Sequence, residues 1–182
     1  KQWTKLLGSS EDDEGQSITI DNDGFIYVLG ETEDNLDSQT NSGNQDVFLS
    51  KYHSNGTKEW TKLLGSSTWD YATSLITGSD GSIYLTGYSY ISSLSYLDGQ
   101  SGNGGKDAYI SKFNSEGDIQ WTKLVGSTLD DFGEGIDIGN DGSLYITGSS
   151  EGNLDGQTNN GRKDAFLSKL TKIYSPTDIN LS

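Results

Sequence analysis

The sequence predicts an all-β protein assembled from tandem copies of one unit. Two observations lead to this prediction: a heptapeptide occurs three times, and the residues between its copies form short apolar runs separated by turn dipeptides. The heptapeptide begins at Trp3, Trp60 and Trp121, so that the copies start 57 and then 61 residues apart. A unit of this length repeated in tandem indicates a stacked or radial repeat architecture.

Four segments of the first copy have the composition of strands, because they are rich in β-branched, aromatic and aliphatic residues. They are residues 17–20, 25–29, 47–52 and 57–64. Asp23-Gly24 joins the first two and Asn55-Gly56 joins the last two, and such dipeptides favour tight hairpin turns. Each copy is therefore expected to contain four antiparallel strands.

The second strand is apolar without interruption in every copy, as in Ile26-Tyr27-Val28, which suits a strand covered on both faces. Small residues precede the first strand, as expected where sheets crowd toward an axis: Gly15, Ala72 and Gly133. Sheets with two apolar faces must stack on one another, and radial stacking gives a β-propeller. We therefore expect about three four-stranded antiparallel blades.

The repeated pattern resembles the SBBP beta-propeller repeat of large bacterial secreted and surface proteins. It reads Trp-Thr-Lys-x-x-Gly-Ser, then Asp-x-small-x-x-aliphatic, then Asp-Gly-Ser-Ile-Tyr-Leu-Thr-Gly and Asp-Ala-Tyr-Ile-Ser-Lys-Phe. The resemblance covers about residues 1–170 and implies a propeller with more blades than this chain holds. It also implies a location outside the cell or at its surface.

The repeat divides residues 1–172 into blades that cover residues 8–64, 65–125 and, as a partial blade, 126–172. Residues 1–7 are interpreted as the last strand of a preceding blade or as a closing strand paired with residues 164–170. A ring of three blades is too tight to close, since propellers typically have about four to eight. We therefore expect an open arc of a larger propeller, or self-association that completes the ring.

The end of the chain departs from the repeat. Residues 173–182 contain the single proline and are expected to form a linker to a following domain. Within them, Pro-Thr-Asp-Ile-x-Leu-Ser resembles the opening of cadherin-like domains. The sequence has no Met, so we expect the chain to be an internal piece of a longer protein.

Composition excludes several function classes. The chain has no Cys and one His, which removes disulfides, thiolate zinc sites, cysteine nucleophiles and multi-histidine metal motifs. With 12 basic and 27 acidic residues its net charge is −15, so we expect no nucleic-acid partner. No apolar run reaches the roughly 20 residues of a membrane span, so no membrane insertion is expected. We expect no enzyme activity and no required cofactor; His53 is interpreted as a surface turn residue, and the acidic run 11–14 as a solvated loop.

The loop before the third strand carries two aspartates nine residues apart in every copy. The six residues are Asp37 and Asp46, Asp98 and Asp107, and Asp155 and Asp164. Hard oxygen donors around a glycine turn suit Ca²⁺. Asp and Asn also stabilise ordinary turns by bonding to their own backbone. A calcium site and a hydrogen-bonded structural loop are therefore the two interpretations of this pattern.

The second copy is enriched in aromatic residues, of which the one at position 71 has an aromatic counterpart, Phe132, in the third copy. They are Trp69, Tyr71, Tyr88, Tyr90 and Tyr96. Aromatic rings flanked by Asp, Asn and Gln commonly bind sugars, because the ring stacks on the apolar sugar face while polar groups bond to the hydroxyls. The alternative is that these rings pack the enlarged loop 88–106 or a neighbouring domain.

Together these features predict a non-enzymatic extracellular scaffold or recognition module of a large bacterial surface or secreted protein. Adhesion or ligand binding would use the loops at the blade rim. Glycans, surface proteins, other blades of the same propeller or a second copy of the chain are the expected partners. The alternative function is a lectin-like domain, or a fragment of a carbohydrate-active enzyme that uses an Asp/Glu pair.

Overall fold

The computed structural model describes residues 2–91 and 94–171. Within these ranges the regular secondary structure consists of β-strands, with no helix. The first sheet is antiparallel and its strand order follows the chain. Its strands are β1 (Asp13–Ile20), β2 (Ile26–Thr32), β3 (Asp46–Tyr52) and β4 (Lys58–Leu64). This is the four-stranded unit that the sequence predicts.

The second sheet repeats this arrangement around a larger loop. Its strands are β5 (Asp70–Thr77), β6 (Ile83–Ser89), β9 (Asp107–Phe113) and β10 (Ile119–Val125). The loop holds a short ribbon made of β7 (Tyr96–Leu97) and β8 (Gln100–Ser101). The third sheet has three described strands, β11 (Asp131–Ile138), β12 (Leu144–Ser150) and β13 (Asp164–Leu170).

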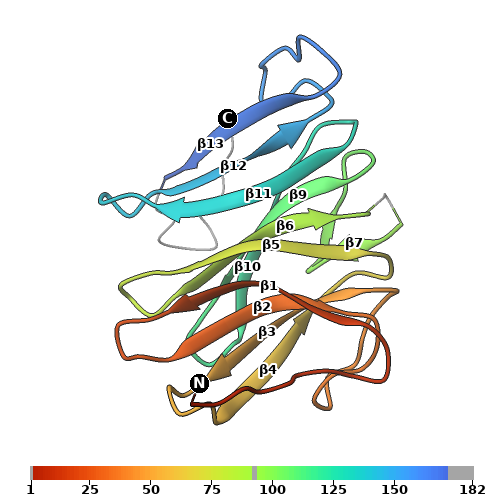
Figure 1. Ribbon diagram of the computed structural model, residues 1–182. Coiled ribbons are helices and arrows are strands. Elements are labelled where there is room, and N and C mark those ends of the chain that lie inside the picture. Colours follow the sequence, from red (N-terminus) through yellow and green to blue (C-terminus); the bar gives the residue numbers. More distant parts are fainter. Residues whose placement is uncertain (1, 92–93, 172–182) are drawn as a thin grey trace.

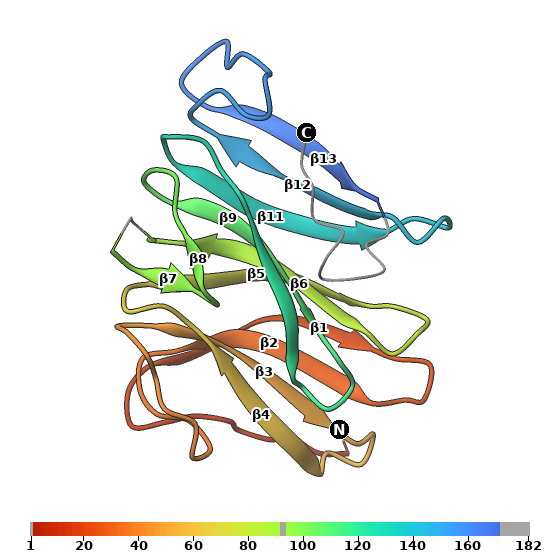
Figure 2. The same ribbon diagram turned by 180° about the vertical axis from the view of Figure 1, so that it is seen from behind.

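The three sheets stack face to face in chain order (Figures 1 and 2). The first strand of each later blade packs on the inner three strands of the blade before it: β5 contacts β1, β2 and β3, and β11 contacts β5, β6 and β9. β4 and β13 lie at opposite ends of the stack, so the three blades form an open arc (Figure 1). The prediction of an all-β propeller segment is confirmed.

Small residues permit the close approach of strands. A side-chain carbon on Gly87 would lie 1.8 Å from the backbone oxygen of Tyr71 on the paired strand. One on Gly133 would lie 2.6 Å from the Gly87 oxygen of the preceding blade. The expected crowding is therefore present at the junction between the second and third blades, and a β-bulge follows each of Gly15, Ala72 and Gly133.

Backbone hydrogen bonds connect consecutive blades. The amide of Asp70 donates to the Gln45 oxygen at 2.9 Å, and the amide of Asp131 donates to the Lys106 oxygen at 2.7 Å. Gln45 and Lys106 occupy equivalent places just before the third strand of their blades. Each junction is therefore fixed by the same main-chain contact in addition to apolar packing.

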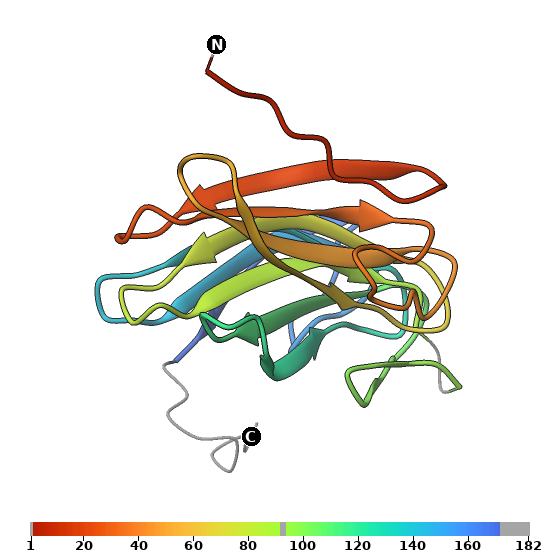
Figure 3. The same ribbon diagram turned by 90° about the horizontal axis from the view of Figure 1, so that it is seen from below.

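The sequence predicts residues 1–7 to be the last strand of a preceding blade or a closing strand, and among the described residues no segment pairs with the outer edge of β13. Residues 2–9 contain no strand, and they lead toward β1 as an irregular segment (Figure 3). β13 lies at the other end of the stack (Figure 1). The segment contacts the first blade, where Trp3 covers Gly56 just as Trp60 covers Gly117 of the second blade.

The proposed linker and its cadherin-like resemblance lie outside the described residues. The short acidic run was expected to be a solvated loop, but Asp13 and Glu14 belong to β1. Among the described residues there is no helix of the length and apolarity that a bilayer crossing requires.

Candidate functional site

Four equivalent positions lie at one end of the first two strands in each blade. They are Asp12, Glu14, Glu31 and Glu33 in the first blade, Trp69, Tyr71, Tyr88 and Tyr90 in the second, and Asp130, Phe132, Ser149 and Glu151 in the third. The outer pair in each blade is joined by one backbone hydrogen bond of 2.9–3.1 Å, and the inner pair is directly opposite across the two strands. The same backbone frame thus presents acids in the first blade and aromatic rings in the second.

The aromatic rings of the second blade form one cluster. Tyr71 and Tyr88 are stacked with ring centroids 4.7 Å apart and planes inclined by 16°. Tyr90 is tilted against Tyr71 at 6.0 Å, and Phe132 of the third blade meets Tyr88 edge-on at 5.0 Å. Such offset and edge-to-face contacts stabilise aromatic clusters beyond the area that they bury. Burial, together with neighbouring ionisable groups, raises the pKa of Tyr71 and of Tyr88.

The other two aromatic candidates are placed differently. Trp69 lies beside the cluster, because its carbonyl accepts the Tyr90 amide at 3.0 Å, and 37% of it is exposed. Tyr96 lies on the ribbon of the enlarged loop and is 55% exposed. The structure therefore brings the rings of Tyr71, Tyr88 and Tyr90 together, with Trp69 beside them, and among the described residues Tyr96 makes no ring contact with this group.

A cavity of about 240 Å³ is lined by the four acidic positions and by one residue of the cluster. Its lining consists of Asp12, Glu14, Glu31, Glu33, Gln45 and Tyr71. Glu31 is buried and its Oε1 accepts the backbone amide of Ala72 at 2.8 Å, which ties the first blade to the second. Burial raises the pKa of Glu31, against the opposing effect of the bonds from Ala72 and Gln16. We call the four acids together with Tyr71, Tyr88 and Tyr90 the rim site.

Lysines already contact the aromatic side of the rim site. Lys106 Nζ lies 4.7 Å from the ring centroids of both Tyr90 and Phe132, and Lys163 Nζ lies 3.8 Å from that of Phe132. Lys106 also pairs with Asp130 at 3.4 Å. Burial lowers the pKa of Lys106, but contacts with Tyr90 and Asp130 outweigh it, so that the net pKa is raised. These aromatic faces therefore accept ammonium groups within the protein itself.

The aspartates proposed for calcium have different environments within each pair. Asp37, Asp98 and Asp155 have positive φ values of 48–50° and lie in tight turns. Asp37 accepts hydrogen bonds from Thr61 at 2.5 Å and from Lys58, both on β4. The carboxylate therefore faces the outer strand of its blade. A salt bridge and hydrogen bonds lower its pKa against the effect of burial, which is the largest single influence.

The second aspartate of each pair caps its own loop. The Oδ2 atoms of Asp46, Asp107 and Asp164 accept the backbone amide four residues earlier, at 2.7–3.0 Å. Among the described residues Oδ1 of Asp46 and of Asp107 is buried without a hydrogen-bond partner. Burial, with a contribution from a neighbouring aspartate, raises the pKa of both side chains to about 6. In the described part of the chain no three His, Cys, Asp or Glu side chains gather as metal ligands, so calcium binding stays a prediction.

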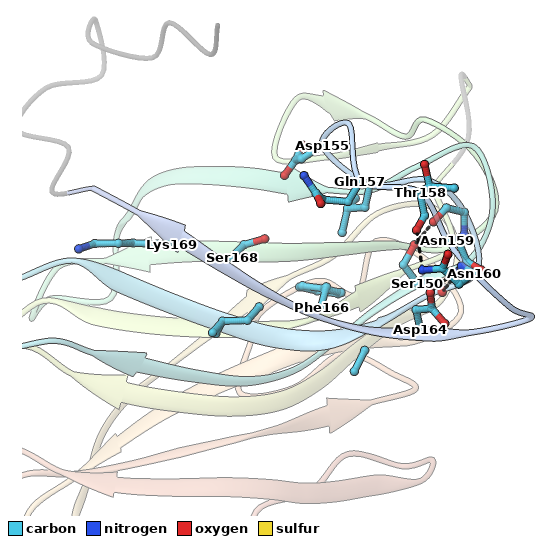
Figure 4. Close-up of a pocket in the computed structure, with 14 residues that line it drawn as sticks. Ser150, Asp155, Gln157, Thr158, Asn159, Asn160, Asp164, Phe166, Ser168 and Lys169 are labelled. Atoms are coloured by element: carbon cyan, nitrogen blue, oxygen red, sulfur yellow. Dashed lines mark hydrogen bonds between the residues drawn. The ribbon is translucent and has the colours of Figure 1, made fainter.

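A second cavity, of about 530 Å³, lies beside β13 and the loop before it (Figure 4). Asp155 and Gln157 come from this loop, whereas Phe166, Ser168 and Lys169 come from the strand. β13 corresponds to β3 and β9, which pair with the outer strands β4 and β10 in the first and second blades. Sequence reasoning recognised that the third blade was incomplete but did not identify this cavity.

Two stretches of the chain, residues 2–37 and 120–155, match the SBBP beta-propeller repeat. They cover equivalent positions in the first and third copies of the unit. The chain is also similar to the regulatory protein FlaEY of Caulobacter vibrioides, with 32% identity over 159 residues. The matched region covers 80% of this chain and 17% of that relative, so the chain corresponds to a small part of its length.

Proposed function

Because the chain carries SBBP beta-propeller repeats, we propose that it is a non-enzymatic recognition segment of a larger extracellular protein and binds its ligand at the rim site. The observation that carries this proposal is the change of chemistry at equivalent positions. Glu14 and Glu31 in the first blade correspond to Tyr71 and Tyr88 in the second, on the same backbone frame. Residues that merely maintain a blade would be expected to repeat, whereas these differ between neighbouring blades.

The rim site favours a cationic group on the ligand. Four acidic residues and Tyr71 are among the residues that line the cavity. An ammonium or guanidinium group gains from nearby carboxylates and from an aromatic face, by roughly 0.5–2 kcal/mol for the aromatic contribution. A lysine or arginine side chain displayed by a surface protein has this chemistry. Its positive charge is complementary to the net charge of −15 on the chain.

Calorimetric titration with spermidine and with a lysine-rich peptide tests this proposal. We expect binding that weakens with salt and is lost in the double variant Glu14→Gln/Glu33→Gln, whose two side chains are exposed and line the cavity. Glu116→Gln is the matched control, because Glu116 lies in an exposed turn of the second blade. Equal binding by the double variant and the control would show that the rim site is not responsible.

A carbohydrate is the second candidate ligand, and the exposure of two rings favours it. Trp69 is 37% exposed and Tyr90 is 41% exposed, so both present surface on which a sugar ring can stack. Binding on a glycan array that is lost in Trp69→Ala would support this candidate. Unchanged glycan binding by Trp69→Ala would remove it.

A carbohydrate-active enzyme fragment would require an Asp/Glu pair to act on the bound sugar. The rim site contains carboxylates with different environments, since Glu31 is buried whereas Glu14 and Glu33 are exposed. A turnover assay on the polysaccharides bound in the array separates the two functions. Binding without release of sugar supports the recognition module, and product formation that stops in Glu31→Gln supports the enzyme.

A further inference from the structure

The third blade presents an uncovered strand and an uncovered face. In the first two blades the central residue of the third strand is buried, with Leu49 2% exposed and Ile110 fully buried. The equivalent Leu167 on β13 is 74% exposed. Among the described residues no strand pairs with the outer edge of β13. Exposed strand edges bind further strands readily, since their backbone groups remain available for pairing.

A polar contact identifies what belongs at this edge. The hydroxyl oxygens of Ser50 and Thr61 lie 2.8 Å apart across β3 and β4, and those of Ser111 and Thr122 lie 2.8 Å apart across β9 and β10. Both pairs are directly opposite in the strand register and are buried. Ser168 is the equivalent residue on β13, where it lines the cavity of about 530 Å³ (Figure 4).

The loop aspartate adds a second element of recognition. Asp37 accepts the hydroxyl of Thr61 at 2.5 Å, so the outer-strand threonine bridges a serine and an aspartate. Asp155 is equivalent to Asp37, has nearly the same φ value and also lines the cavity. The edge of β13 therefore offers the same two partners to an incoming threonine.

The chain holds a third copy of the segment that fills this position elsewhere. Thr61 and Thr122 each lie within Trp-Thr-Lys, which occurs again as Trp3-Thr4-Lys5. In the chain's own sequence, the positions that align with Trp60 and Thr61 are Asp178 and Ile179, so the motif does not follow β13. Residues 2–7 carry the motif and form no strand in the described structure.

The uncovered apolar faces of the first and third blades carry residues equivalent to those that pack together at the two blade junctions. Leu49 and Leu75 belong to one apolar cluster across the first junction, and Ile110 and Ile136 belong to one across the second. The next residues in this series are Leu167 on β13 and Ile18 on β1, which are 74% and 65% exposed. β1 belongs to the first blade and β13 to the third, so a second copy of the chain can bring these two residues together.

We propose that residues 2–7 of a second copy add to β13 as the missing outer strand, with Thr4 opposite Ser168 and beside Asp155. The first blade of that copy then stacks on the third blade, so that Ile18 meets Leu167. Trp3 already covers Gly56 of its own blade as Trp60 covers Gly117, so the segment can stay on its blade while it pairs. Reciprocal exchange between two copies joins two arcs of three blades into one closed assembly.

Engineered disulfide formation tests the register, and the absence of native cysteines makes the result unambiguous. We expect mild oxidation of Thr4→Cys/Ser168→Cys to give a covalent dimer of about twice 19.7 kDa, because directly opposite residues have the separation a disulfide requires. Thr4→Cys/Leu167→Cys is the control, since Leu167 points to the other face of β13. An intramolecular disulfide, no disulfide, or equal dimer in both variants would overturn the proposal.

A second test uses a synthetic peptide that competes with residues 2–7 for the edge of β13. This test does not require the cysteine variants to fold. The synthetic peptide Lys-Gln-Trp-Thr-Lys-Leu-Leu-Gly-Ser should bind the unmodified chain and shift its dimer toward monomer. The same peptide with valine in place of threonine should bind at least about tenfold more weakly, since it leaves Ser168 and Asp155 without their partner. Equal binding of both peptides, or of neither, would contradict recognition of Thr4 at β13.

Discussion

The Ser50 and Thr61 hydroxyl oxygens lie 2.8 Å apart in the buried interior of the first blade, and Thr61 also donates to Asp37. One hydroxyl thereby joins the third strand, the fourth strand and the loop between the second and third strands. Because the hydroxyl contacts all three segments, it helps to fix the position of the outer strand. The same serine–threonine pair recurs in the second blade.

Replacing Thr61 with valine should therefore destabilise the protein. The substitution keeps the shape of the side chain but leaves Ser50 and Asp37 without their shared partner, at a cost of about 1–3 kcal/mol. Urea denaturation measures the free energy of unfolding. Thr61→Ser retains the hydroxyl and should lose less stability, whereas equal losses in both variants would show that the methyl group matters and the hydrogen bond does not.

Gly87→Ala should be more harmful than a glycine substitution elsewhere in the sheet. The added carbon would lie 1.8 Å from the Tyr71 backbone oxygen, which a rotamer change cannot relieve, so a loss of about 1–3 kcal/mol or more is expected. Gly15→Ala is the control, because nothing lies within 4 Å of the added carbon. Equal melting temperatures for the two variants would contradict the tight strand approach at Gly87.

The protein should be less stable at neutral pH than at about pH 4, because two buried aspartates hold their protons more tightly in the folded state. Asp46 and Asp107 have folded-state pKa values of about 6, above the ordinary value of 3.8, chiefly because they are buried. The folded state therefore holds protons more tightly than the unfolded state between these values. Stability should fall as the pH rises from about 4 through about 6.

The double variant Asp46→Asn/Asp107→Asn isolates this effect. An amide is neutral at every pH, so the free energy of unfolding of the variant should vary less between pH 4 and 7 than that of the unmodified chain. Chemical denaturation at each pH provides the measurement. An unchanged pH dependence would assign the effect to other groups.

Calcium should leave the melting temperature unchanged if the repeated aspartates are structural. Asp37 already bonds to Lys58 and Thr61, and Asp46 accepts a backbone amide in the loop before β3. The two carboxylates therefore have different hydrogen-bond partners. Thermal denaturation with millimolar calcium and with chelator tests this. A melting temperature that rises with calcium, and does so less in Asp46→Asn, would favour the metal interpretation instead.

Local sequence signals predicted the strands because each depends on neighbouring residues. The turn at Asp23-Gly24 has a glycine with φ of 84°, as its dipeptide indicates, and the uninterrupted apolar run at Ile26–Val28 lies in β2. Strand ends were less predictable. β1 begins at Asp13 because its polar residues pair with β2, a contact that the expectation of a solvated loop did not include.

The rim site was predicted only in part. Tyr71, Tyr88 and Tyr90 stood out because the first copy has glutamates at all three positions and the third copy has an aromatic residue only at the first of them, and the structure brings the three rings together. The acidic half was missed, since Glu14 and Glu31 meet through strand pairing and face Tyr71 through blade stacking. Comparison of the three copies position by position contained that signal, but it became interpretable only when the sheet register was known.

If the two ends of the three-blade arc are complementary, the chain should associate with itself. Light scattering coupled to size exclusion, over a range of protein concentrations, measures this association. We expect a mass that rises from near 19.7 kDa toward twice that value with concentration, and a smaller rise in Leu167→Lys. A mass of 19.7 kDa at every concentration would show that the ends of the arc are not complementary.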